Sequence, residues 1–176
     1  MATKWDLAGA HALRRYIWQL LQDELGWSTD NYGGLNPIIT PQQEPELNEF
    51  NAPYIVYVFS KRPAGSLWLM EKEDMSISIF SVSDTEINQV VNLLSTKLAK
   101  HDEAAQDVNA FIRGTMPAGS FYKNFDFKSI VVTGAQGSNA SVTEGGRKDG
   151  YVTLSYTYTL YESDPNSPDY GESIRI

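Results

Sequence analysis

The residues best suited by type and spacing to acid–base or metal chemistry are the carboxylates of the run Glu71-Lys72-Glu73-Asp74. Paired carboxylates act as acid and base in glycoside hydrolysis, and carboxylate oxygens also bind Mg²⁺. Because the run stands between two apolar segments, the simpler interpretation is a solvated turn. Three more carboxylates, in a proline-rich stretch, are expected to be exposed in the same way: Glu44, Glu46 and Glu49.

The two histidines, His11 and His101, are the other candidates for proton transfer. Each falls on its own predicted helix, and no motif links either one to a nucleophile or to a carboxylate partner. No serine lies in a Gly-x-Ser-x-Gly elbow. We expect His101 to end its helix, where a positive charge favours the dipole, and His11 to lie on a helix flank. We therefore predict no catalytic residue and no enzymatic activity.

Cysteine is absent from the 176 residues, which excludes disulfides and thiolate metal sites. We predict neither a metal site nor a cofactor. The net charge of −8 argues against a dedicated nucleic-acid surface, which usually has a basic face. The N-terminal residues lack a signal-peptide pattern, and no apolar run reaches the ~20 residues of a membrane-spanning helix. The composition therefore predicts a protein made in a reducing cytoplasm, without a membrane.

A glycine-rich stretch, residues 134–150, reads GAQGSNASVTEGGRKDG. It lacks the G-x-x-x-x-G-K-[ST] spacing of a phosphate-binding loop and does not lead from a strand into a helix. We interpret it as the tip of a hairpin. The tip is either simply mobile or becomes ordered on contact with a neighbouring molecule.

The N-terminal part predicts a helix over residues 6–25, with Asp6 as its N-cap and Gly26 at its end. Its aromatic residues exceed what one apolar stripe needs, so some pack under loops or against another subunit. Residues 28–52 contain several prolines and predict an extended, polyproline-like connection. Four apolar residues are expected to anchor this connection along a sheet edge: Ile38, Ile39, Leu47 and Phe50.

The centre of the chain predicts three strands followed by a helix. The strands are Tyr54–Phe59, Ser66–Met70 and Met75–Val82, and the first is apolar on both faces, which is typical of a central strand. Ser83 and Glu86 match a capping box. The helix that follows carries one apolar stripe: Ile87, Val90, Val91, Leu94 and Leu98.

After His101 the helical pattern weakens and predicts a further helical turn or two, ending near Gly114. Two strands follow, Phe121–Thr133 and Tyr151–Tyr161, and form a long hairpin. The predicted fold is one α+β domain, residues 1–161. Its sheet is mixed and mainly antiparallel, with the N-terminal helix, a second helix packed on one face and the long hairpin near the C-terminus. Residues 162–176 are polar and proline-broken, and we expect an extended C-terminal arm.

This order of elements resembles the tail terminator, or tail completion, proteins of long-tailed bacteriophages. The resemblance is carried by the helix Asp6–Leu25, by APYIVYVFS at Ala52–Ser60, by SISIFSVSDTEINQVVNLLSTKL at Ser76–Leu98, and by the pair FKSIVVTG and YVTLSYTYT. It covers most of residues 5–161.

The resemblance implies a structural virion protein whose subunits form a ring, commonly a hexamer. Such a ring caps the tail tube and joins the tail to the head or neck. Its partners would be the tube protein and the connector proteins, and DNA would pass through it without specific binding. Its location would be the virion tail or neck, and the host cytoplasm during assembly. We expect the hairpin tip, one basic turn and the arm to make the interfaces: Gly137, Ser138, Asn139, Glu144, Arg147, Lys148, Lys61, Arg62 and Tyr170.

Three alternatives stay open from the sequence. The first is another head–tail connector or neck protein. The second is a small ligand-binding module or enzyme that uses the carboxylates and the glycine-rich loop, and such a protein should have a pocket with convergent polar groups. The third is a monomeric adaptor that binds by sheet-edge addition.

Overall fold

A computed structural model describes residues 8–47, 49–62, 70–117, 119–138 and 146–161, and the single residues 166, 168 and 171. Its elements are α1 (Gly9–Leu25), η2 (Thr29–Tyr32), β1 (Ile38–Ile39), η3 (Pro41–Gln43), α2 (Glu44–Leu47), β2 (Tyr54–Arg62), β3 (Glu71–Ser81), α3 (Asp84–Leu98), α4 (Asp102–Thr115), η4 (Phe121–Asn124), β4 (Phe125–Gln136) and β5 (Lys148–Leu160). The strands form one sheet in the order β1-β2-β3-β5-β4. Only the β1–β2 pair is parallel, so the predicted α+β fold with a mixed, mainly antiparallel sheet is confirmed.

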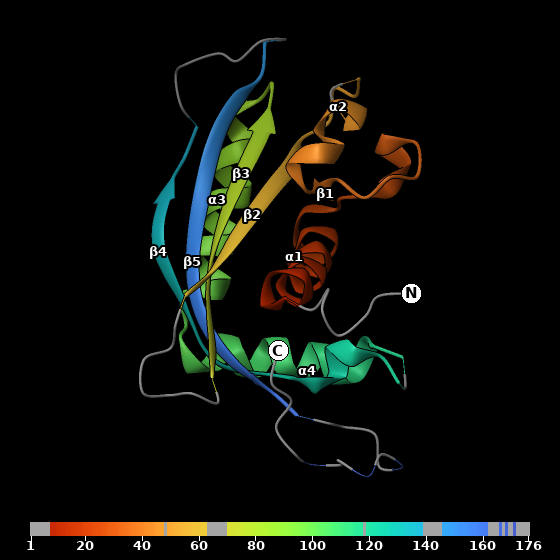
Figure 1. The fold of residues 1–176 in the computed structure, drawn as a ribbon. Helices are drawn as coiled ribbons and strands as arrows, with labels where there is room; N and C mark the ends of the chain where they lie inside the picture. Colours follow the sequence, from red (N-terminus) through yellow and green to blue (C-terminus); the bar gives the residue numbers. More distant parts are fainter. Residues whose placement is uncertain are drawn as a thin grey trace.

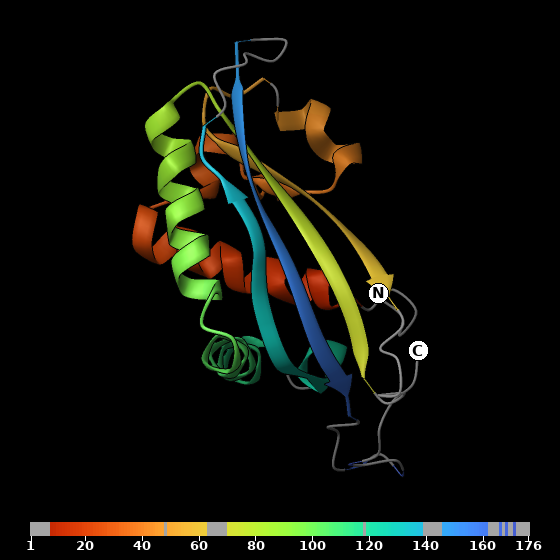
Figure 2. The ribbon, with the colours of Figure 1, turned by 90° about the vertical axis from the view of Figure 1, so that its left-hand side faces the viewer.

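The helices α1, α3 and α4 gather on one side of the long, curved strands (Figures 1 and 2). The strands β3 and β5 alternate buried and half-exposed residues, and the buried set faces these helices. The predicted apolar stripe of α3 is buried throughout. The main core therefore lies between one face of the sheet and the three helices, as the periodicities predict.

The strand predictions need three corrections. First, Glu71–Asp74 is the start of β3 and not a turn. Second, β2 continues through Lys61 and Arg62, which were predicted to lie in a turn. Third, β2 is not central along its whole length, because β1 pairs with it only at Ile55 and Val56. Of the strand predicted at residues 66–70, only Met70 lies within the described residues, and it is not in a strand.

The connection between α1 and β2 is not the extended polyproline path that we predicted, because it contains η2, η3 and α2. Its anchoring along the sheet edge is confirmed. Ile38 and Ile39 form β1 beside β2, and a second apolar cluster covers the upper part of the sheet face opposite the helices. That cluster consists of Tyr32, Ile39, Leu47, Tyr54 and Val56, with Phe50, Ala52 and Phe80 packed against it.

The helix ends follow the predictions in part. Gly26 ends α1 with φ 68°, in the left-handed region that glycine favours. Asp6 lies outside the described residues, and α1 begins at Gly9. His101 does not end a helix but precedes α4 as its N-cap residue, with φ 48°. At the start of α3, Ser83 Oγ accepts from Glu86 N, while the Ser81 hydroxyl links the Glu86 carboxylate to Ser83 N.

The hairpin of β4 and β5 is longer than predicted at its tip end, because β4 reaches Gln136 and β5 starts at Lys148. At the other end, residues 121–124 form η4 and not the start of the strand. Residues 139–145, and most of the arm 162–176, lie outside the described residues.

Candidate functional site

The structure places the predicted interface residues at two opposite ends of the sheet. Gly137, Ser138, Arg147 and Lys148 lie where β4 ends and β5 begins, whereas Lys61 and Arg62 end β2. Lys148 pairs in register with Ser81, and Arg62 pairs with Lys72 at the other end of β3. Asn139, Glu144 and Tyr170 lie outside the described residues. The predicted set therefore does not form one continuous patch.

The hairpin end is attached to the N-terminus of α3. Ser138 N donates to Asn88 Oδ1 over 2.9 Å, the Ser138 hydroxyl donates to Asp84, and Lys148 Nζ lies 2.8 Å from Asp84 Oδ2. The hydrogen bond from Lys148, followed by that from Ser138, lowers the pKa of the exposed Asp84 carboxyl. A Cβ on Gly137 would lie 2.5 Å from Asn88 Oδ1, so a larger residue there would displace the Asn88 side chain from Ser138 N. These residues fix the base of the tip.

Arg147 is buried, with 5% of its surface exposed, which disagrees with its predicted role at an interface. Its guanidinium lies 5.0 Å from the centre of the Tyr54 ring and donates to the carbonyl oxygens of Ala52 and Phe50. Burial, together with Glu44, raises the pKa of Tyr54 to about 12. Arg147 thus holds the α1–β2 connection against the sheet.

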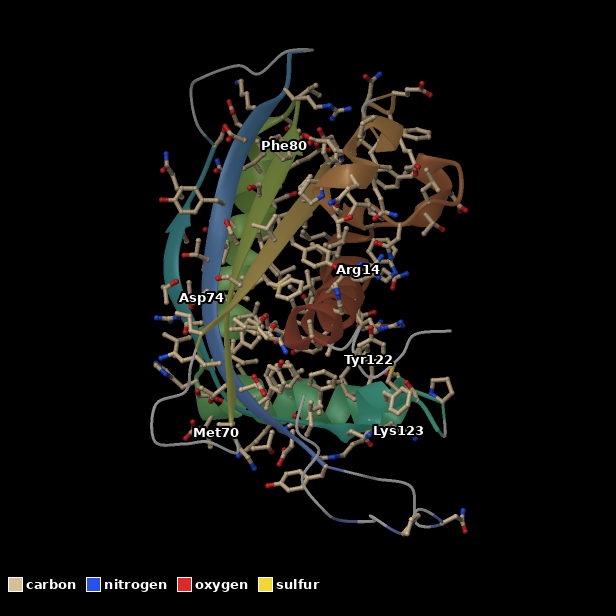
Figure 3. All side chains as sticks on the ribbon, in the orientation of Figure 1. Arg14, Met70, Asp74, Phe80, Tyr122 and Lys123 are labelled. Carbon is tan, nitrogen blue, oxygen red and sulfur yellow. The ribbon has the colours of Figure 1, made fainter. Side chains whose placement is uncertain are left out.

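At the opposite end of the sheet, Arg62 is already engaged. It forms an ion pair with Asp74 and donates to Ser155 Oγ over 3.2 Å. Figure 3 labels Asp74 on the lower part of the sheet and Phe80 near its upper end. Lys61 precedes Arg62 at the exposed end of β2.

The sheet face opposite the helices is lined below the second apolar cluster by hydroxyl side chains. We call it the serine/threonine face and define it by Ser76, Ser78, Ser129, Thr133, Thr153, Ser155 and Thr157. Cross-strand hydroxyl pairs order it: Ser129 Oγ lies 2.9 Å from Thr157 Oγ1, and Thr133 Oγ1 lies 2.9 Å from Thr153 Oγ1. A shallow hollow of ≈ 220 Å³ opens there beside Val58 and Asp74. The alternation of β3 and β5 in the sequence already indicated this face.

Glu73 is the only acidic residue among the buried residues of the described structure, with 0% of its surface exposed. Its Oε1 accepts from Ala10 N at 3.1 Å and from the Tyr156 hydroxyl at 2.8 Å. Its Oε2 accepts from Gly9 N at 3.0 Å and from the Tyr158 hydroxyl. The predicted solvated position is therefore wrong, because the first N–H groups of α1 and two tyrosines replace water around this carboxylate.

The contacts of Glu73 indicate a structural role, because they join the start of α1 to β5. Burial, and then Glu73, raises the pKa of both tyrosines. A Cβ on Gly9 would lie 2.6 Å from the Tyr158 ring, so glycine lets the start of α1 approach β5. Because Glu73 has no exposed surface, a substrate cannot reach it.

A larger hollow, ≈ 440 Å³, lies between α4 and β4. Three of its charged groups, Arg113, Asp126 and Lys128, pair with one another. Asp126 accepts from Arg113, Lys128 and Asn109 at distances of 2.7–3.3 Å. The sequence offered no signal for this network, since its members lie on separate elements.

The remaining candidates for chemistry are dispersed. His11 Nδ1 lies 2.7 Å from the Tyr57 hydroxyl, on the flank of α1 as expected. Within the described ranges no three His, Asp or Glu side chains lie close enough to hold a metal ion.

No helix of those ranges combines the length and apolar character that spanning a membrane requires. Comparison of the chain with protein-family models and with curated proteins gave no match.

Proposed function

We propose that this chain is a structural virion subunit, a tail terminator that forms a ring, caps the tail tube and joins the tail to the head or neck. The observation that carries the proposal is the uneven covering of the sheet. The helices bury one face, while the serine/threonine face has no cover from the described elements. The residues of β2 from Val58 to Arg62 are exposed, and of these the Phe59 ring contacts His11 of α1. An assembly subunit needs such surface for its neighbours.

Two further features support a role in assembly over catalysis. Ion pairs within the chain lie beside two of the hollows, at Asp126 and at Asp74. The net charge of −8 suits a channel that DNA crosses without adhering. The element order adds the resemblance to tail terminators, for which a hexameric ring and partners in the tube and neck are the expected assembly.

The open half of β2 also favours one alternative, an adaptor that binds an extended peptide by sheet-edge addition. An adaptor of this kind is a monomer, whereas a tail terminator closes into a ring. Oligomeric state therefore separates the two functions.

Native mass spectrometry of the purified chain over a concentration series tests the proposal. We expect a closed ring, six subunits being the expected number, and negative-stain images of annular particles. A chain that stays monomeric at every concentration, alone and with tail tubes present, contradicts the ring.

A matched pair of variants locates the surface. Thr133→Arg adds a long cation to the serine/threonine face, and Thr96→Arg adds the same group to the exposed side of α3. We expect the first to reduce ring formation at least tenfold and the second to leave it unchanged. Equal behaviour of the two variants would remove the serine/threonine face from the interface.

A further inference from the structure

A groove between α1 and α4 combines aromatic side chains with arginines. It encloses ≈ 190 Å³ and is lined by Arg14, Arg15, Trp18, Gln19, Asn36, Phe111, Thr115 and Met116. We call it the arginine groove. Trp18, Phe111 and Met116 are partly buried apolar residues packed against the main core. The groove therefore offers an apolar floor beside two guanidinium groups.

Within the part of the chain that the structure describes, the two arginines have no acidic partner. Among the ion pairs of the described residues, neither Arg14 nor Arg15 pairs with a carboxylate. Arg14 Nε donates to Ile38 O over 2.8 Å, and the Arg15 guanidinium lies 4.7 Å from the centre of the Tyr122 ring. Both side chains are thus held in position while their charge is left for an outside carboxylate. Figure 3 shows Arg14 and Tyr122 on the α1 side of the molecule.

The C-terminal segment 162–176 has the complementary chemistry. It reads ESDPNSPDYGESIRI, with four acidic residues and one basic residue. Its prolines, Pro165 and Pro168, have the P-x-x-P spacing that aromatic-lined grooves bind in the polyproline conformation. Neither proline has an N–H group to donate to a strand ladder, which favours groove binding over sheet-edge addition. An aromatic groove bearing cations is the surface of this molecule that such a segment fits best.

The position of the segment also matches the groove. Tyr161 N donates to Asn124 O over 2.9 Å, so the chain leaves the sheet beside η4. Tyr122, also in η4, contacts the Arg15 guanidinium through its ring. In a cyclic ring all subunits point the same way along the axis. A segment that leaves at the level of the groove can therefore reach the groove of the next subunit. Fifteen residues span up to about 50 Å when extended, which is ample for that distance.

We propose that the arginine groove binds residues 162–176 of a second copy of this chain. The inference rests on the proposed ring, because a ring interface joins two different surfaces of neighbouring subunits, and the groove and the segment are such a pair. The acidic side chains pair with Arg14 and Arg15, while the prolines and Tyr170 contact Trp18 and Phe111.

Cross-linking between single-cysteine variants tests this docking, because the chain has no cysteine of its own. Ser167→Cys marks the segment and Gln19→Cys marks the groove. The control, Gln89→Cys, makes the same substitution on the exposed side of α3. We expect an equimolar mixture of the segment and groove variants to form a covalent heterodimer with a bismaleimide. The yield should exceed that with Gln89→Cys at least tenfold at low salt.

A charge exchange checks the chemistry of recognition. Arg15→Glu in the groove variant should lower the cross-linking yield at least fivefold. Asp164→Arg in the segment variant should restore it when the two are combined. Recovery by the second charge change cannot come from misfolding of the Arg15→Glu chain.

Three results overturn the inference: equal yields with Gln19→Cys and Gln89→Cys, no effect of Arg15→Glu, or a cross-link that forms only within a doubly substituted chain. Native mass spectrometry of the unmodified chain, run in parallel, shows whether a ring forms. This measurement separates failure of the docking from failure of the proposed function. A ring without the cross-link removes only the docking, whereas the heterodimer without a ring removes only the tail terminator role.

Discussion

The two outer edges of the sheet are treated differently. On β4, the Asn109 side chain of α4 bonds to the strand as another strand would: Phe127 N donates to Asn109 Oδ1 at 2.7 Å, and Asn109 Nδ2 donates to Phe127 O at 2.9 Å. Two register shifts, at Phe127/Ser129 and Val132/Gly134, further distort this edge. On the outer side of β2, the side that faces away from β3, no described strand pairs with the residues beyond Val56.

The two edges differ in how far they are protected against pairing with a strand of another molecule. Helices, bulges and bonded side chains are the usual means by which proteins prevent unwanted sheet extension. Here they protect β4 and leave the lower half of β2 open. These features disfavour edge-to-edge joining of two sheets through β4 around Phe127, whereas the outer side of β2 carries no such protection.

The largest expected effect is at Glu73, where α1 is attached to the strands that carry both edges. Glu73→Gln replaces two acceptor oxygens by one, so donors among Gly9 N, Ala10 N and the two tyrosine hydroxyls lose their partner. Each buried donor left without an acceptor costs about 1–3 kcal/mol, so we expect a loss of about 2–5 kcal/mol in the free energy of unfolding, measured by urea denaturation. Glu71→Gln, two residues away on β3, should change it by about 0.5 kcal/mol. A Glu73→Gln chain of unchanged stability would contradict the structural role of this carboxylate.

Asn109→Ala should remove the protection of β4. It leaves the N–H and C=O of Phe127 without their partner, at about 2–3 kcal/mol, and it should promote aggregation through the opened edge. Thermal melting and light scattering measure the two effects. Asn92→Ala, on the exposed side of α3, is the control. If both variants behave alike, Asn109 does not guard the edge.

A proline pair tests the open edge directly. Because Ile55 N donates to Pro37 O, the odd-numbered residues of β2 direct their N–H groups to the outer side. Lys61→Pro should therefore change stability by less than about 1 kcal/mol. Ser60→Pro removes a hydrogen bond to β3 and should destabilise the fold by about 2–3 kcal/mol. Urea unfolding measures the stability of both variants. If Lys61→Pro is the more destabilising of the two, the assignment of the outer side of β2 is wrong.

The smallest effect concerns the tip end of β4. The pKa of Asp84 is lowered in the folded chain, so its hydrogen bonds favour folding above the ordinary carboxyl pKa, and that contribution is lost as the pH falls through the lowered value. The protection of the Ser138 amide, measured as its exchange rate relative to the intrinsic rate at each pH, should fall over this acidic range. The Asp84→Asn variant should show no such pH dependence.

The elements with a strong period were predictable from the sequence. The stripe of α3 and the alternation of β5 depend on neighbouring residues alone, and both are as expected. The errors arise where the hydrogen-bond partners of a charged side chain lie far away in the sequence. Four charged residues in a row indicate a turn, but Glu73 is compensated by Gly9, 64 residues away. Arg147 follows glycines and so looks exposed, but its partners Ala52 and Phe50 are more than 90 residues away.

The candidate surfaces were predictable to different degrees. The serine/threonine face follows from alternation within single strands. The arginine groove does not, because Arg15 and Phe111 come from two helices whose packing no local pattern specifies. The surplus of aromatic residues in the first helix was the only local signal of it.

The contact between Glu73 and α1 also orders events during synthesis. The residues of α1 leave the ribosome early, but the groups that complete its N-terminus include Tyr158, which follows Gly9 by 149 residues. At about 5–20 residues per second, roughly 7–30 s pass before that partner is made. For this interval α1 lacks one of the groups that attach its N-terminus, so its native docking must wait until Tyr158 has been synthesised.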